Sequence, residues 1–168
     1  MRAAGLDDAT MREAFLAFEP LAHRFERVAV IDGVEYIDDS KATSIAALVA
    51  GIEMGSELPN LQTTKPQILL IAGGLAKGDD PKIAIPVLTK RVKKVYLIGS
   101  CAELFSAAWR ESVDCEICGT LEKAVAAAKR EAATGDKVLL SPGTASFDQF
   151  NNFGERGEVF ARLARKGK

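Results

Sequence analysis

The chain has 168 residues, which suits one domain with a substantial buried core. Its 22 basic residues nearly balance 23 acidic ones, for a net charge of −1, and no basic block stands out. This composition argues against binding to nucleic acid or to a membrane surface through bulk charge. No apolar run approaches the roughly 20 residues of a membrane span and no signal peptide is visible, so we expect a cytoplasmic protein.

The first part of the chain predicts a β-hairpin. Two apolar runs, Val28–Ile31 and Val34–Ile37, flank the dipeptide Asp32-Gly33. Asp-Gly between two such runs is typical of a tight hairpin turn. Around this hairpin the patterns predict an amphipathic helix over 1–18, a helix over about 44–54 and a polar loop over 55–66.

From residue 67 onward, short apolar runs alternate with helical stretches. The predicted strands are 67–72, 95–98, 113–117 and 137–140, and the predicted helices are 82–92, 102–110, 121–133 and 149–166. Ile68–Ile71 is continuously apolar, as in a strand buried on both faces. Strands separated by helices of this length imply right-handed crossovers. We therefore predict an α/β fold with a mostly parallel sheet and the N-terminal hairpin as its antiparallel edge.

Polar and small residues follow three of the predicted strands, at 39–43, 73–80 and 141–148. Because the carboxyl ends of parallel strands meet at one edge of a sheet, these loops should converge on one crevice. The first loop places Asp39, Ser40, Lys41 and Thr43 before a predicted helix, whose free N–H groups favour an anion. The alternative is that the acid and the hydroxyls only cap that helix while Lys41 is solvated.

The other two loops also carry groups suited to an anion. Glycines at 73–78 allow close backbone approach and Lys77 adds a cation, although the G-x-x-x-x-G-K-[ST] pattern of a phosphate loop is missing. In the third loop, Ser146 and nearby amides can hold a carboxylate at a predicted helix start. The alternatives are a glycine-rich surface turn for the second loop and a helix cap by Ser146 or Asp148 for the third.

The histidine and the cysteines predict no separate chemistry. Cys115 and Cys118 have C-x-x-C spacing, but no second pair exists and His23 is the single histidine, so a zinc site lacks ligands. The pair also falls in a predicted strand. His23 lies far from any nucleophile-elbow sequence, which excludes a Ser-His-Asp or Cys-His arrangement. The neighbouring Arg24 has the planar fork that suits phosphates and carboxylates.

Taken together, these motifs resemble the C-terminal domain of the Mur ligases. The matching residues are His23-Arg24-Phe25-Glu26, Gly33-Val34, Asp39–Thr43, Gly73-Gly74, Lys77-Gly78, Leu139–Pro142, Ser146–Phe150, Phe153, Arg156-Gly157 and Phe160. The resemblance covers essentially the whole chain in the right order. It implies a Rossmann-like single domain over 1–168, without the UDP-binding N-terminal and ATP-binding central domains of the family.

The Asp-Ser-Lys-Ala-Thr and Ser-Pro…Ser-x-Asp-Gln-Phe signatures resemble those of the family members that add D-glutamate to UDP-N-acetylmuramoyl-L-alanine. The resemblance implies a step of peptidoglycan synthesis in which ATP phosphorylates the muramoyl-L-alanine carboxylate. The amine of D-glutamate then attacks the acyl phosphate. ATP and Mg²⁺ would be bound mainly by the missing central domain, and no residue of this chain is implied as a metal ligand. We expect this chain alone to be monomeric and inactive.

The resemblance also implies roles for single residues. Arg24, Asp39 and Lys41 would be the catalytic and ATP-binding residues on the nucleotide side of the cleft: Asp39 would contact ribose, and the two cations would face the phosphates. The matches to the D-glutamate site are Thr43, Lys77, Ser146, Phe147 and the backbone of Phe153.

Three departures from the family pattern concern neighbours of those residues. Ser44 stands where asparagine is common, Leu75 or Ala76 replaces an aspartate, and Phe147 replaces a leucine. Two other interpretations stay open. One is the corresponding domain of a sister ligase that adds another amino acid, and the other is a non-catalytic stand-alone binding domain.

Overall fold

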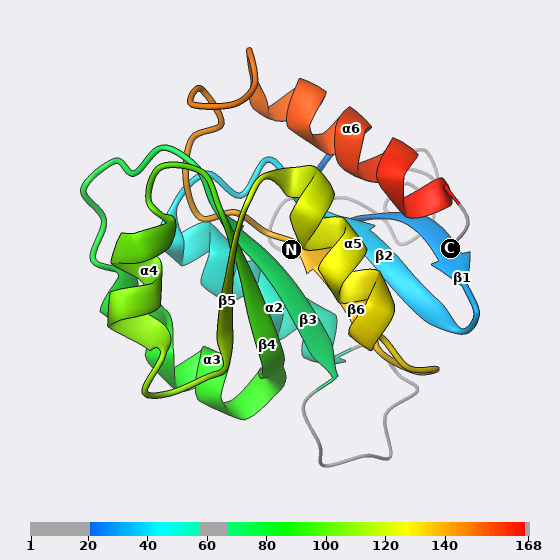
Figure 1. Cartoon of the computed structure of the whole chain (residues 1–168), viewed down its shortest axis with the longest axis horizontal. Coiled ribbons are helices and arrows are strands. Elements are labelled where there is room, and N and C mark those ends of the chain that lie inside the picture. Colours follow the sequence, from blue (N-terminus) through cyan, green and yellow to red (C-terminus); the bar gives the residue numbers. More distant parts are fainter. Residues whose placement is uncertain (1–20, 58–66, 167–168) are drawn as a thin grey trace, which may run out of the picture.

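The computed structural model describes residues 21–57 and 67–166 and is built on a six-stranded sheet (Figure 1). The strands, in spatial order, are β1 (Glu26–Ile31), β2 (Val34–Asp38), β6 (Lys137–Leu140), β3 (Ile68–Gly73), β4 (Val92–Ile98) and β5 (Cys115–Gly119). Only β1 and β2 pair antiparallel, and the other neighbours are parallel. The predicted mostly parallel sheet with an antiparallel hairpin edge is confirmed.

Helices cover both faces of the sheet (Figure 1). One face carries α2 (Ile45–Glu57), the short 3-10 helix η2 (Pro81–Ala84), α3 (Ile85–Arg91) and α4 (Ala102–Trp109), and the other carries α5 (Leu121–Glu131) and α6 (Phe153–Arg165). The central strand β3 contributes side chains to the hydrophobic core on both faces of the sheet. Leu70 packs toward α2 and α4, while Leu69 and Ile71 pack toward α5 and α6. This alternation gives the continuous apolar run that the sequence showed.

The hairpin forms where Asp32-Gly33 predicted it. Both residues have positive φ, at 53° and 76°, as the two central positions of a type I′ turn require. Ile31 and Val34 pair directly across the turn. The other end of this hairpin leads into the loops described below.

Some predicted boundaries were wrong. Val92, predicted as the end of a helix, begins β4, because it pairs with Ile68 in the parallel ladder. The strand predicted at 113–117 runs from 115 to 119. The last helix begins at Phe153 and not at 149, because the Asn152 side chain accepts the N–H of Glu155 and sets the start of α6.

The segment after α2 differs in part as well. Residues 55–57 belong to α2, where a loop was predicted. The predicted helix over 1–18 and the rest of the predicted loop, 58–66, lie outside the described residues. Within the described part of the chain, no helix is long and apolar enough to cross a bilayer.

Cys115 and Cys118 are free thiols that belong to opposite faces of the sheet. Burial raises the pKa of each thiol to about 11, so both are protonated at neutral pH. These positions and raised pKa values agree with the interpretation of the two cysteines as structural.

Candidate functional site

The loops after β2, β6 and β3 meet at the carboxyl edge of the sheet, because these three strands are neighbours. We call residues 39–43 the β2 loop, 141–148 the β6 loop and 73–80 the glycine loop. The β2 and β6 loops join through the Gly143 N–H, which donates to the Ala42 carbonyl over 2.9 Å. Leu75 in the glycine loop and Ala145 in the β6 loop form an antiparallel bridge. The predicted convergence of the three loops is confirmed.

A strained turn before β1 presents Arg24 beside these loops. The residues on either side of it, His23 and Phe25, both have positive φ, at 60° and 50°, which costs free energy for L-residues. Two aspartates hold the turn: the His23 ring contacts the Asp38 carboxylate at 2.7 Å, and Asp39 accepts the N–H of Phe25 at 3.2 Å. Arg24 itself is exposed.

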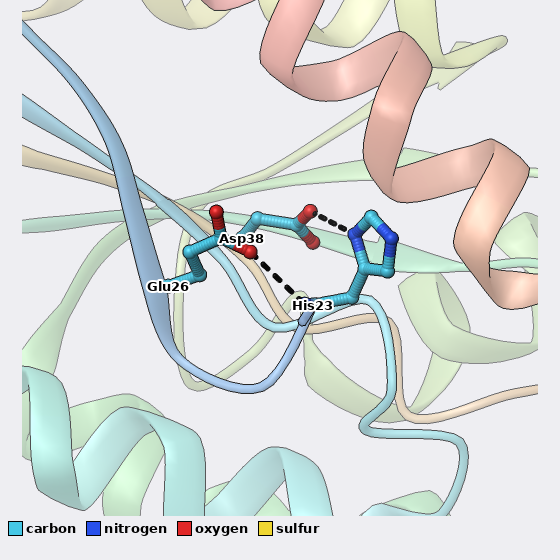
Figure 2. Close-up of side chains that lie close together, drawn as sticks. All are labelled: His23, Glu26 and Asp38. Atoms are coloured by element: carbon cyan, nitrogen blue, oxygen red, sulfur yellow. Dashed lines mark hydrogen bonds and ion pairs between the residues drawn. The ribbon is translucent and has the colours of Figure 1, made fainter. Parts of the chain in front are cut away.

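His23, Glu26 and Asp38 form the one cluster of metal-ligand type among the described residues. Figure 2 shows that the side chains of Glu26 and Asp38 both contact His23 of the same chain. The His23 ring faces one Asp38 oxygen, and the other oxygen accepts the Ser40 N–H at 2.8 Å. Glu26 accepts the backbone N–H of His23 at 3.1 Å. The cluster therefore fastens the turn through contacts within the chain.

Asp39 connects the β2 and β6 loops. Its Oδ2 accepts the Ser141 hydroxyl at 2.8 Å, and its Oδ1 accepts the Phe25 N–H. Burial raises the pKa of Asp39 to about 6, against the lowering effect of these two hydrogen bonds. A Cβ on Gly51 would lie 2.5 Å from Oδ2, so only glycine lets α2 approach this closely.

The N-terminus of α2 is capped by residues other than the predicted ones. Ser44 Oγ accepts the Ala47 N–H at 3.2 Å, and Asp79 from the glycine loop accepts the Ile45 N–H at 3.2 Å. The interpretation in which Asp39, Ser40 and Thr43 merely cap this helix is therefore wrong. The cap by Asp79 also ties the glycine loop to α2.

Apart from Arg24, which lies in the turn before β1, the predicted ligand residues lie on the three loops and on the first turn of α6. Lys41 is half-buried, with its Nζ 5.6 Å from the centre of the Phe153 ring. Ser146 is 2% exposed, whereas the next residue, Phe147, is 68% exposed. Of the other predicted ligand residues on these loops, Thr43 is half-buried and Lys77 is exposed.

The cap interpretation of the β6 loop is also wrong. α6 takes its cap from Asn152, as described above, and Ser146 instead closes a turn through its carbonyl, which accepts the Phe150 N–H at 2.9 Å. Asp148 accepts the Ser100 N–H at 2.8 Å, in the loop after β4. The Ser146 hydroxyl is thus not used as a helix cap.

Sequence reasoning assigned no role to Arg156, which is 1% exposed behind the loops. The signal was its position, because Arg156 and Gly157 occupy the buried side of α6 between Phe153 and Phe160. Burial lowers the pKa of Arg156 to about 10, and the guanidinium remains charged at neutral pH. Gly157 is needed there, since a Cβ would lie 2.3 Å from the His23 ring and 2.5 Å from Asp38.

A family model described as "Mur ligase, glutamate ligase domain" matches residues 23–144, and the chain belongs to this family. Two curated relatives are named UDP-N-acetylmuramoylalanine–D-glutamate ligase. The protein from Nitratidesulfovibrio vulgaris is 43% identical over 88% of this chain, and that from Lawsonia intracellularis is 38% identical over 96%. The chain spans about a third of the length of these relatives (32% and 35%).

Solved structures share the fold at low sequence identity. A bifunctional folylpolyglutamate synthase/dihydrofolate synthase from Yersinia pestis matches with a TM-score of 0.65 and 20% identity, over 94% of this chain and 34% of that one. A murein peptide ligase from Psychrobacter arcticus matches with a TM-score of 0.61 and 12% identity, over 95% and 33%. These likenesses show the fold alone.

Proposed function

We propose that this chain is the amino-acid-binding domain of a ligase that adds D-glutamate to UDP-N-acetylmuramoyl-L-alanine. The observation that carries the proposal is the convergence of Thr43, Lys77 and Ser146 on one edge of the sheet, from three different loops. The names of the curated relatives favour the same substrate. In this proposal residues 1–168 form one domain, and the UDP-binding and ATP-binding parts come from other segments.

The loops suit a ligand with two carboxylates. Lys77 is exposed and, within the described residues, forms no ion pair, so its ammonium group is available to a carboxylate. Thr43 and Ser146 add hydroxyl donors. α6 begins at Phe153, and the first N–H groups of a helix lack acceptors inside it and favour an anion. In this arrangement D-glutamate binds between a cation and several neutral donors, with Phe147 beside them.

The nucleotide side depends on Arg24 and Lys41. Neither forms an ion pair with a carboxylate among the described residues, so both cations fit the phosphates of ATP. Bound ATP, with its Mg²⁺, supplies the phosphoryl group that activates the muramoyl-L-alanine carboxylate. Arg24 and Lys41 would stabilise the negative charge that develops on transfer, while Mg²⁺ would be held outside this chain.

The contact between Asp39 and ribose stays a prediction. Both Asp39 oxygens already accept hydrogen bonds within the chain, and a ribose hydroxyl would have to use the remaining lone pairs. We propose the cytoplasm as the compartment, as the resemblance to the Mur ligases implies.

A chimaera tests the proposal. In the Nitratidesulfovibrio vulgaris relative, the segment that this chain matches is replaced by this chain. Phosphate release is then measured with ATP, UDP-N-acetylmuramoyl-L-alanine and, in turn, D-glutamate, L-glutamate, L-lysine and meso-diaminopimelate. We expect release with D-glutamate alone, and a KM for D-glutamate at least 10-fold higher in Lys77→Met. Lys82→Met, another exposed lysine nearby, is the matched control.

Two outcomes would overturn the proposal. A folded chimaera that uses another amino acid would point to a sister ligase. A folded chimaera that releases no phosphate, next to an active parent enzyme, would point to a stand-alone binding domain.

A further inference from the structure

A buried guanidinium connects the β2 loop, the β6 loop and α6. Arg156 Nε donates to Ser40 Oγ at 2.9 Å, and Nη2 donates to the Ser40 carbonyl at 2.9 Å. On the β6 side, Nη2 donates to the Thr144 carbonyl at 3.2 Å and Nη1 to the Ala145 carbonyl at 3.4 Å. One side chain thus binds two loops that are more than 100 residues apart in the sequence.

All these acceptors are neutral. Among the described residues, no carboxylate forms an ion pair with Arg156. A buried arginine usually has such a partner, because desolvating an unpaired charge is costly. The planar guanidinium donates to both the β2 loop and the β6 loop from fixed directions, and it therefore fixes the separation of the two loops. A lysine has a single ammonium group and does not do this.

Two of the three acceptor residues directly precede a proposed ligand of the amino acid or the nucleotide. Ser40 precedes Lys41, and Ala145 precedes Ser146. The Ser40 hydroxyl that accepts from Arg156 in turn donates to the carbonyl of Phe153 at 2.7 Å. A displacement of the guanidinium would therefore move the Ser146 hydroxyl and the first turn of α6 relative to one another.

We propose that Arg156 is the positioning residue of the D-glutamate subsite, an inference that rests on the function proposed above. It acts through Ser40, Thr144 and Ala145 and touches no substrate. It holds the Ser146 hydroxyl and the start of α6 at the separation that two carboxylates need, before the ligand arrives. Since the geometry is set in advance, less ordering free energy is lost on binding.

Arg156 has no carboxylate within ion-pair distance among the described residues, and its positive charge, opposed in part by the more distant Asp148 and Asp38, adds to this effect. A positive charge in a poorly solvated interior acts over a longer distance than one in water, because the effective dielectric constant is lower. Arg156 lies directly behind the loops that carry Lys41 and Ser146. It therefore favours an amino acid with two carboxylates and a net negative charge, such as glutamate, over a zwitterion of zero net charge at this edge.

The test compares Arg156→Lys with Arg162→Lys in the chimaera. Arg162 is exposed on the same helix and controls for the change of residue type. We expect Arg156→Lys to raise the KM for D-glutamate at least 10-fold while kcat changes less than 3-fold, and Arg162→Lys to change neither by more than 2-fold. A residue needed only for folding would lower the active fraction, and with it the apparent kcat, at an unchanged KM.

Ser40→Ala supplies a second, milder variant in case Arg156→Lys does not fold. It removes the Nε acceptor and the contact with Phe153, and it leaves the guanidinium in place. We expect a 3- to 10-fold rise in the KM for D-glutamate. A KM within 2-fold of the unsubstituted chimaera in Ser40→Ala, and in Arg156→Lys where it folds, would overturn the inference. An unsubstituted chimaera that does not use D-glutamate would instead overturn the proposed function.

Discussion

The loops at the carboxyl edge are anchored in two different ways. Residues 39–40 and 141–146 are buried, and Asp39, Ser141 and Arg156 link them through side-chain hydrogen bonds. The glycine loop is exposed from residue 75 to residue 80, and it is attached through the Leu75–Ala145 bridge and the Asp79 cap on α2. Ser146, a neutral donor of the site, thus lies on a buried and cross-linked loop, while the main cation, Lys77, lies on the exposed loop.

This difference has a physical consequence. Substitutions around the buried loops should cost folding free energy, because they disturb packed and desolvated groups. Substitutions in the glycine loop should cost little stability and should act on ligand binding. The following four predictions test this contrast.

Gly157→Ala should have the largest effect. Alanine is the better helix former, but its Cβ would lie 2.3 Å from the His23 ring and 2.5 Å from Asp38, in the anchor of the Arg24 turn. We expect a loss of about 3 kcal/mol in the free energy of unfolding, measured by urea denaturation. Gly154→Ala, three residues earlier in α6, is the control. Its closest contact would be 3.0 Å, and a comparable loss there would contradict the explanation.

Asp39→Asn should change how stability depends on pH. The native pKa of about 6 lies above the usual 3.8, so the native state binds the proton more tightly, and stability falls as pH rises from about 4 to above 6. This loss amounts to at most about 3 kcal/mol, and asparagine, which has no charge, avoids it. Urea denaturation at pH 5 and pH 8 should therefore show wild type losing stability relative to the variant. Parallel pH dependences would refute the assignment.

Gly78→Ala should cost about 1–2 kcal/mol, since its φ is +94°, although nothing lies within 4 Å of the added methyl group. Gly119→Ala, at φ +79° and also in open space, should cost a similar amount. The two should differ in binding, because Gly78 follows Lys77 directly. A raised KM for D-glutamate in the chimaera with Gly78→Ala alone would agree with the contrast, and equal KM values would contradict it.

Asp79→Ala should have the smallest effect on stability. It removes the side-chain acceptor of the Ile45 N–H, a loss of about 1 kcal/mol typical of a helix cap, and Ser44→Ala should cost about the same. Only Asp79→Ala also releases the glycine loop from α2. Amide hydrogen exchange at residues 76–78 should therefore speed up in Asp79→Ala and not in Ser44→Ala. Equal exchange in the two variants would show that the cap does not hold the loop.

The sequence by itself determined the elements whose cause is local. Asp32-Gly33 specified the hairpin because both positions accept a positive φ, and the continuous apolar run of Ile68–Ile71 specified a strand buried on both faces. Alternating strands and helices specified a parallel sheet, and a parallel sheet brings its loops to one edge. The candidate residues on those loops followed from this topology and from the family resemblance.

The tertiary structure alone decided which distant groups meet. β6 lies between β2 and β3, which brings Ser141 to Asp39 and Ser40 to Arg156 across more than 100 residues of chain. The tertiary structure also decided that Val92 belongs to a strand. Val92 lies at the end of a helical sequence pattern, but its pairing with Ile68 in the parallel ladder is the stronger effect. Periodicity and turn chemistry report on neighbours in sequence, whereas a buried hydrogen bond depends on which segments pack together.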